Sequence, residues 1–170
     1  EGPTAGITFE FENVITASDS DAPLTVKWDN KDNYTYVHSV LHRFLNADNH
    51  SILSRLPEDL QKVILNAKKS VLLHYSSGEY KTYDSYIAKL FPLCYAEFQN
   101  ASGLLAEEGT LYEYYKGKND KARVKNTVGG TPTSYWTRSP WISKGTVSYY
   151  IGIAGALLNI SGVTTPQAVA

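Results

Sequence analysis

Alternating apolar and polar residues predict β-strands near both ends of the chain. Residues 7–15 (ITFEFENVI) and 24–28 (LTVKW) show the two-residue period of a half-buried strand. The polar run between them favours a hairpin or two neighbouring strands. Further strands are expected at 71–75, 134–139, 146–153 and 156–160.

Two helices are predicted where the apolar period lengthens to that of a helix. The first covers 34–46, with Asn33 as its N-cap and its apolar side chains on one face. The second covers 57–69, with a buried stripe that includes Leu60 and Val63. Early helices with strands on both sides indicate an α+β fold with an antiparallel sheet.

Length and composition fit one compact unit, in which an N-terminal β-hairpin segment (1–33) precedes the main body (34–170). The 170 residues are 42% hydrophobic, enough for a sizeable core. The net charge is −1 with no basic stripe, which argues against nucleic-acid binding. No apolar run reaches the roughly 18 residues of a membrane span. Cys94 is the single cysteine, so no internal disulfide forms, and its apolar neighbours predict a buried thiol.

Candidate metal ligands do not form a recognised site. His38 and His42 share a helix face, but the chain lacks the glutamate of a catalytic zinc motif, and a solvated face is the simpler interpretation. The Asp- and Asn-rich runs 19–23 and 29–33 lack the pattern of a calcium loop and are typical of turns. We therefore expect no metal and no cofactor.

No catalytic motif is evident either, and we expect the protein not to be an enzyme. The chain has no G-x-S-x-G elbow and no phosphate-binding glycine loop. Four glutamates share one region, which keeps a hydrolase with paired carboxylates open as an alternative. These are Glu97, Glu107, Glu108 and Glu113.

Ordered segments in the second half carry a family resemblance. They are LFPLCYAEF (90–98), GTLYEYYKG (109–117) and above all YWTRSP (135–140). Their order resembles the domain of unknown function 6273 family (DUF6273), over roughly residues 34–163. The resemblance implies a C-type-lectin-like fold, related to formylglycine-generating enzymes, in a gut-bacterial surface protein or phage structural protein. Oxidase chemistry would need paired cysteines, and the chain has only Cys94.

The resemblance also implies a closing strand with the pattern G-V-x-P-A-F. The corresponding segment here reads TTPQAVA (164–170). We expect this strand to be missing, which would leave an open sheet edge for a neighbouring chain to fill.

The function expected from these features is non-enzymatic binding through late loops rich in Tyr and Trp. Such aromatic side chains anchor glycan or protein contacts at low entropic cost. The partner would be a glycan or protein receptor on a cell surface, and the protein would be extracellular or virion-associated. The alternative is a self-assembling structural subunit of a phage particle or filament, with strand exchange between copies. The expected contact residues are Tyr112, Tyr114, Tyr115, Trp141, Tyr149 and Tyr150.

The stretch YWTRSPW (135–141) combines structural and displayed residues. We expect one of its first two aromatics to face the core, with Trp136 in a structural role. Arg138 is expected to be partly buried and paired with an acidic side chain, for which Glu97 is the best candidate. Trp141 follows the Ser-Pro turn, in the segment expected to be displayed.

Overall fold

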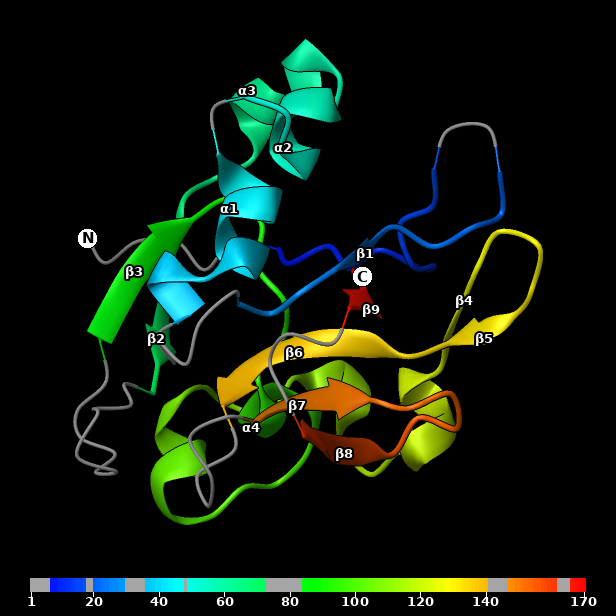
Figure 1. The fold of residues 1–170 in the computed structure, drawn as a ribbon. Coiled ribbons are helices and arrows are strands. Elements are labelled where there is room, and N and C mark those ends of the chain that lie inside the picture. Colours follow the sequence, from blue (N-terminus) through cyan, green and yellow to red (C-terminus); the bar gives the residue numbers. More distant parts are fainter. Residues whose placement is uncertain are drawn as a thin grey trace.

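The computed structural model describes residues 7–17, 20–29, 36–47, 49–72, 84–140, 147–161 and 166–170. Short helices and small sheets make up an α+β fold, as predicted (Figure 1). Within these ranges, no helix is both long and apolar enough to cross a membrane.

The main sheet has five strands in the order β1-β9-β6-β7-β8. The strands are β1 (Thr25–Val26), β6 (Tyr135–Pro140), β7 (Val147–Ile151), β8 (Leu157–Ser161) and β9 (Gln167–Ala168). The three late strands predicted from alternation are thus confirmed as β6, β7 and β8. Two smaller two-stranded sheets pair β2 (Ala67–Val71) with β3 (Asp84–Ala88) and β4 (Lys125–Asn126) with β5 (Pro132–Thr133).

The helices are all short. They are α1 (Val40–Asn46), α2 (Ile52–Arg55), α3 (Glu58–Val63) and α4 (Tyr95–Phe98), with 3-10 turns η1 (Tyr36–His38), η2 (Gly103–Glu107), η3 (Glu113–Tyr115) and η4 (Asp120–Arg123). The first predicted helix is confirmed over α1, whose N-cap is Ser39, because its side chain accepts a hydrogen bond from the amide of His42. Asn33 lies outside the described residues.

The second predicted helix, 57–69, was too long. Helix α3 ends at Val63, and residues 67–71 form β2, which pairs antiparallel with β3. Pairing with β3 outweighs the helical propensity of this segment, a tertiary effect that the local pattern does not contain. The expected buried stripe is also wrong, because α3 has no buried residue and Val63 is 69% exposed.

The strand predicted over 7–15 does not form. Residues 7–11 have no regular secondary structure, and the hairpin is reduced to a single bridge between Thr16 and Pro23. The side chains of Ile7 and Phe9 are 83% and 89% exposed. The apolar side of this segment therefore faces outward, the reverse of the expected arrangement. We call residues 7–12 the N-terminal strap.

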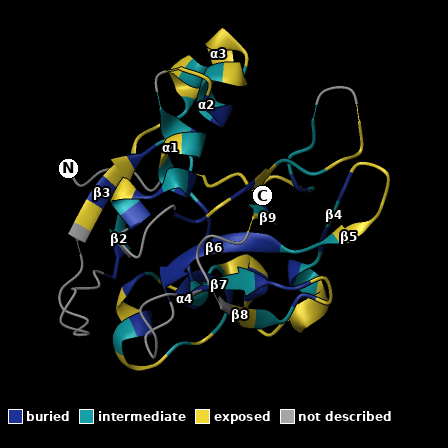
Figure 2. Ribbon diagram, viewed as in Figure 1, coloured by how far each residue is buried: buried dark blue, intermediate teal, exposed yellow. Residues whose placement is uncertain are grey.

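Strand β6 separates two core clusters and is buried along its whole length (Figure 2). Trp136 packs with α1 and β1, whereas Tyr135 packs with α4 and β7. Successive side chains of a strand point to opposite faces, so the two aromatics enter different clusters. The expectation that only one of them faces the core was wrong, and the structural role of Trp136 is consistent with its 1% exposure.

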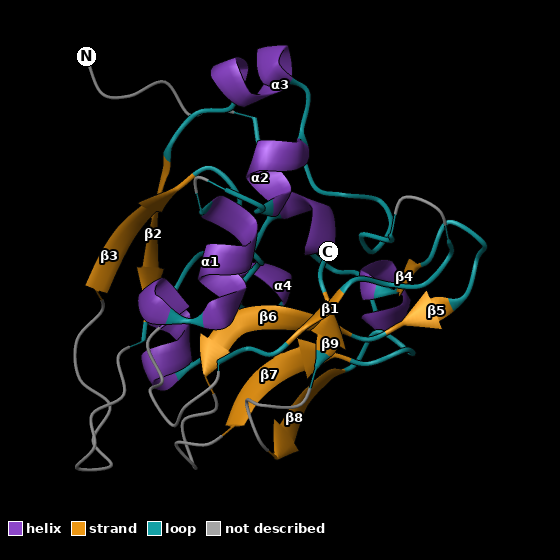
Figure 3. Cartoon of the chain, turned by 45° about the horizontal axis from the view of Figure 1, so that its top comes forward, coloured by secondary structure: helices purple, strands orange, loops and turns teal. Residues whose placement is uncertain are grey.

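The expectation of a missing closing strand is wrong, because residues 167–168 form β9. It pairs antiparallel with β1 and parallel with β6, and so it lies inside the sheet rather than at its edge (Figure 3). Ala168 is only 1% exposed there. Because β1 comes from the 1–33 segment, β9 also joins that segment to the main body.

Candidate ligand-binding groove

A buried polar cluster surrounds Arg138, which has no exposed surface. Its guanidinium donates through Nη1 to the carboxylate of Glu97, at 2.5 Å, and to the carbonyl oxygen of Pro92, at 2.8 Å. Nη2 donates to the carbonyl oxygen of Glu108 at 3.0 Å. The expected pair of Arg138 and Glu97 is confirmed, although the arginine is fully rather than partly buried.

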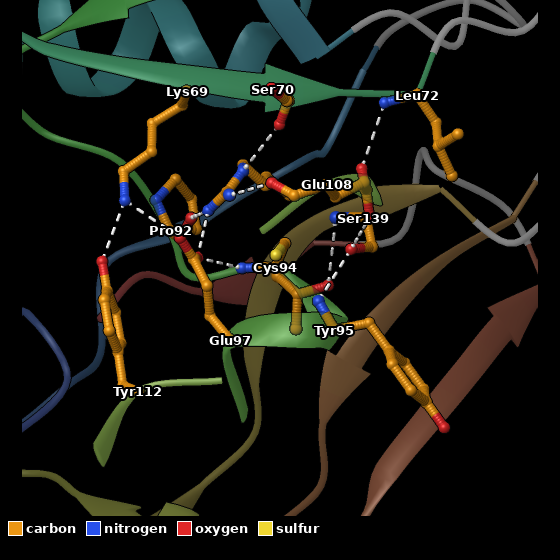
Figure 4. Close-up of polar contacts among 12 residues, drawn as sticks. Lys69, Ser70, Leu72, Pro92, Cys94, Tyr95, Glu97, Glu108, Tyr112 and Ser139 are labelled. Atoms are coloured by element: carbon orange, nitrogen blue, oxygen red, sulfur yellow. Dashed lines mark hydrogen bonds and ion pairs between the residues drawn. The ribbon is translucent and has the colours of Figure 1, made fainter. Parts of the chain in front are cut away.

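Glu97 is engaged at both carboxylate oxygens (Figure 4). Oε1 accepts from the ammonium of Lys69 at 2.9 Å, and Oε2 also accepts from the amide of Cys94 at 2.8 Å. Burial alone would raise the pKa of Glu97, but the charge of Arg138 and the hydrogen bonds hold that pKa below its ordinary value. Glu97 is therefore a fixed anion that joins β6 to β2.

Glu108 is the second carboxyl of the cluster. Its Oε1 accepts from the amide of Leu72 at 3.1 Å, and the hydroxyl of Ser139 bonds to its Oε2. Burial raises the pKa of the Glu108 carboxyl to about 7. The sequence placed Glu108 among four clustered glutamates, but its partners lie far along the chain and gave no local signal.

Cys94 lies against this cluster as a buried thiol, as expected (Figure 4). Burial raises the pKa of the thiol well above its ordinary value, so the thiol stays protonated. A Cβ on Gly109 would lie 3.0 Å from Sγ and 2.9 Å from Cγ of Glu97. The cluster is thus closely packed with its carboxylate oxygens occupied, an arrangement that holds β2, β6 and the 92–97 segment together.

A groove of about 740 Å³ lies on the other side of Tyr112, beneath the N-terminal strap. The buried rings of Phe98, Tyr115 and Tyr135 border it, and Tyr112 and Tyr114 line it with more exposed rings. Strap residues 8–12 form the facing wall. Nine of its 21 described lining residues are aromatic.

The strap is held over the groove by Glu10. The hydroxyl of Tyr115 lies 2.7 Å and 2.8 Å from the two carboxylate oxygens of Glu10, and the ammonium of Lys125 lies 3.0 Å from one of them. Lys125 also donates to the carbonyl oxygen of Phe11. Glu10 on the polar side of the strap therefore faces the body of the protein. This explains why Ile7 and Phe9, on the apolar side, point outward.

The expected contact residues do not form one surface. Tyr112 is half-buried and Tyr114 is 58% exposed, and both line the groove. Tyr115 was expected to be displayed, which is wrong, because it packs edge-on against Phe98 in the core and is 4% exposed.

The remaining expected contact residues lie elsewhere. Tyr149 packs edge-on against Tyr95 at a centroid distance of 4.9 Å. Tyr150 is half-buried and packs on the same core cluster as Trp136. Neither lines the groove. Trp141 lies outside the described residues.

A second, shallower cavity of about 500 Å³ adjoins the groove, because Tyr112 and Glu113 line both. Lys69 lines this cavity, with its ammonium 4.0 Å from the ring centroid of Phe91 and bonded to the hydroxyl of Tyr112 at 2.9 Å. Lys69 thus holds the side chain of Tyr112 between the groove and this second cavity.

The described residues contain no group of three His, Cys, Asp or Glu side chains arranged to hold a metal ion. His42, expected on a solvated helix face, instead packs edge-on between Tyr36 and Tyr86, at centroid distances of 5.2 Å and 5.4 Å. Asp21 accepts hydrogen bonds from the hydroxyl of Thr127 and the amide of Gly129, each at 2.6 Å. This carboxylate therefore fixes the 127–130 turn, consistent with the turn-forming role expected of its run.

One family matches most of the chain. Residues 13–169 match the family described as Domain of unknown function (DUF6273). No curated protein and no solved structure gives a significant match.

Proposed function

The chain belongs to the DUF6273 family, and we propose that it is a non-enzymatic ligand-binding module whose contact site is the groove under the N-terminal strap. The observation that carries this proposal is the position of Tyr112 and Tyr114 along a groove of about 740 Å³. A concave site of this size, lined by aromatic side chains, is the usual form of a ligand pocket.

The hydrogen bonds made by the two buried carboxyl groups support a binding function rather than a hydrolase. Glu97 and Glu108, the buried carboxyls that a hydrolase would use, have protein partners on both oxygens. Tyr112, by contrast, offers a ring face fixed by Lys69, so little entropy is lost when a ligand packs against it.

The setting of the module is proposed from the same resemblance. A C-type-lectin-like arrangement would combine the short helices α1–α3 with the five-stranded sheet and leave the long connections on one surface. Such a module would work at the surface of a bacterium or on a phage virion, outside the cytoplasm. Its partner would be a glycan or protein receptor on a cell surface.

The test is binding of the labelled chain to a glycan array and to a display library of random twelve-residue peptides. Tyr114→Ala is expected to weaken binding at least about tenfold, a loss typical of a central aromatic contact. Tyr149→Ala is the control, because Tyr149 lies outside the groove. Equal losses in both variants, or no ligand from either collection, would contradict the groove as the contact site.

A self-assembling subunit is the second candidate, and the edge strand β8 favours it. Among the described strands β8 has one neighbour, β7, and Leu158 on it is 43% exposed. Ile153, in the turn before it, is 63% exposed. An open edge with apolar side chains recruits strands from other copies. Sedimentation velocity over a hundredfold concentration range tests this, with Leu158→Lys expected to abolish any assembly.

A further inference from the structure

The N-terminal strap runs along the groove without a strand partner among the described residues. Within the described part of the chain, no amide or carbonyl of residues 7–12 bonds to another backbone group. Its one backbone contact is the carbonyl oxygen of Phe11, which accepts from Lys125. Unpaired backbone groups of this kind form a ready template for an added strand.

The sequence of the strap favours a strand once a partner is supplied. ITFEF (7–11) alternates β-branched or aromatic residues with polar ones, and both types are common in strands. Glu10 already fixes the middle of the strap to Tyr115 and Lys125, so part of the ordering cost is met before a ligand arrives.

The polar groups of the groove suit a peptide better than a sugar. A sugar needs several free side-chain partners for its hydroxyls. The carboxylate of Glu10 is bound to Lys125, the ammonium of Lys89 to the carbonyl oxygen of Gln61, and the carboxylate of Glu113 to Lys116. Glu12 is the one charged lining residue that has no partner among the described residues, and the groove otherwise offers the ring of Tyr114 and the unpaired backbone of the strap.

We infer that the ligand of the groove is an extended peptide that adds to the N-terminal strap as a β-strand and places alternate apolar side chains against the rings of Tyr112 and Tyr114. Main-chain hydrogen bonds to residues 8–12 supply affinity, and the exposed ring of Tyr114 and the half-buried ring of Tyr112 select the side chains. This inference rests on the proposed function, since it names the ligand of the same groove.

The negative charge of Glu12 predicts a further feature of the peptide ligand. Glu12 lines the groove, and among the described residues no side chain pairs with its carboxylate. A basic residue beside the apolar positions of the peptide would complement this charge. We therefore expect selected peptides to carry Lys or Arg next to alternating Val, Ile, Phe or Tyr.

The experiment starts from the random twelve-residue display library and continues with one selected peptide made synthetically. Hydrogen exchange of the strap amides is measured with and without this peptide. Strand addition is expected to slow exchange of alternate amides within 8–12 at least about tenfold. Two N-methylated forms of the peptide serve as a matched pair. Methylation of the amides that face the strap should weaken binding at least about tenfold, whereas methylation of the intervening amides should not.

The outcomes separate this inference from the proposed function. A peptide that depends on Tyr114 but leaves the strap amides unprotected overturns strand addition and leaves the groove as a binding site. The same holds if no peptide is selected while a saccharide binds in a Tyr114-dependent way. A peptide whose binding is unaffected by Tyr114→Ala but weakened by Tyr149→Ala overturns both statements, as does the absence of any ligand.

Discussion

The carboxylate of Glu97 holds the guanidinium of Arg138 at 2.5 Å inside a cluster that solvent does not reach. Glu97→Gln leaves Arg138 buried without its anion, so we expect the free energy of unfolding to fall by about 3–5 kcal/mol. Urea denaturation of the purified variant measures this loss.

The matched control is Glu58→Gln, which breaks an exposed ion pair with Lys62. It should change stability by no more than about 0.5 kcal/mol, as is typical of surface pairs. Replacing both partners, Glu97→Gln with Arg138→Met, should restore part of the loss because the guanidinium is then no longer buried without its anion. A loss at Glu97 as small as that at Glu58 would contradict the structural role of the pair.

Glu108 makes stability depend on pH in a defined window. Its pKa rises from an ordinary 4.5 to about 7 in the folded chain, so folding favours the protonated form. The stabilisation is present below about pH 4.5 and is lost as pH rises through 7, by an amount on the order of 3 kcal/mol. Thermal unfolding from pH 4.5 to 7.5 should show this fall for the natural chain but not for Glu108→Gln. Parallel curves for the two proteins would rule the effect out.

Cys94 should react slowly while the chain is folded. Its thiol is buried and its pKa is raised, so little thiolate is present at neutral pH. Labelling by a chromogenic disulfide reagent at pH 7.5 should be at least about a hundredfold slower than in 8 M urea. Gly109→Ala, which presses on Sγ, should accelerate labelling in the folded protein. Equal rates with and without urea would show that the site is open.

Two glycines with similar backbone angles allow the cost of backbone strain to be measured separately from the cost of a steric clash. Gly117 and Gly155 have φ of 70° and 84°, a region that favours glycine. Gly117→Ala meets open space and should cost about 1–2 kcal/mol from backbone strain alone. The methyl group of Gly155→Ala would overlap the carbonyl oxygen of Asp120. The unfolding equilibrium constant should therefore rise several-fold more than for Gly117→Ala. Chemical denaturation measures the free energy of unfolding of both variants. Equal losses would contradict the close approach of Gly155 to the carbonyl oxygen of Asp120.

Much of the sheet could be predicted because its strands are locally encoded. Alternation located β6, β7 and β8. The place of Arg138 in the W-x-R-S-P block of the family suggested a structural role with an anionic partner, for which Glu97 was the best candidate. Pairing between distant segments could not be predicted in this way. The β2 segment has helical composition and becomes a strand only through β3, and β9 is two residues long with little pattern of its own.

The groove itself was not predicted from the sequence, although some of the expected contact residues line it. Tyr112 and Tyr114 stood out as aromatics in a turn-rich segment, but their neighbour Tyr115 is buried because its ring packs against Phe98 in the core. The strap itself was also misread. Periodicity shows which side chains share a face, but not which face packs on the body of the protein. Here the ion pair between Glu10 and Lys125 turns the polar face of the strap inward.

The position of β9 also sets the order of events during synthesis. Val26 pairs with Gln167, so β1 is made early and has no neighbour in the sheet until the last strand has left the ribosome. At usual translation rates this interval is on the order of ten seconds. During that time Trp28 and the inner face of α1 lack part of their cover. The nascent chain therefore exposes this apolar surface to chaperones throughout the interval between residues 26 and 167, and the sheet is completed only after residue 168 has emerged.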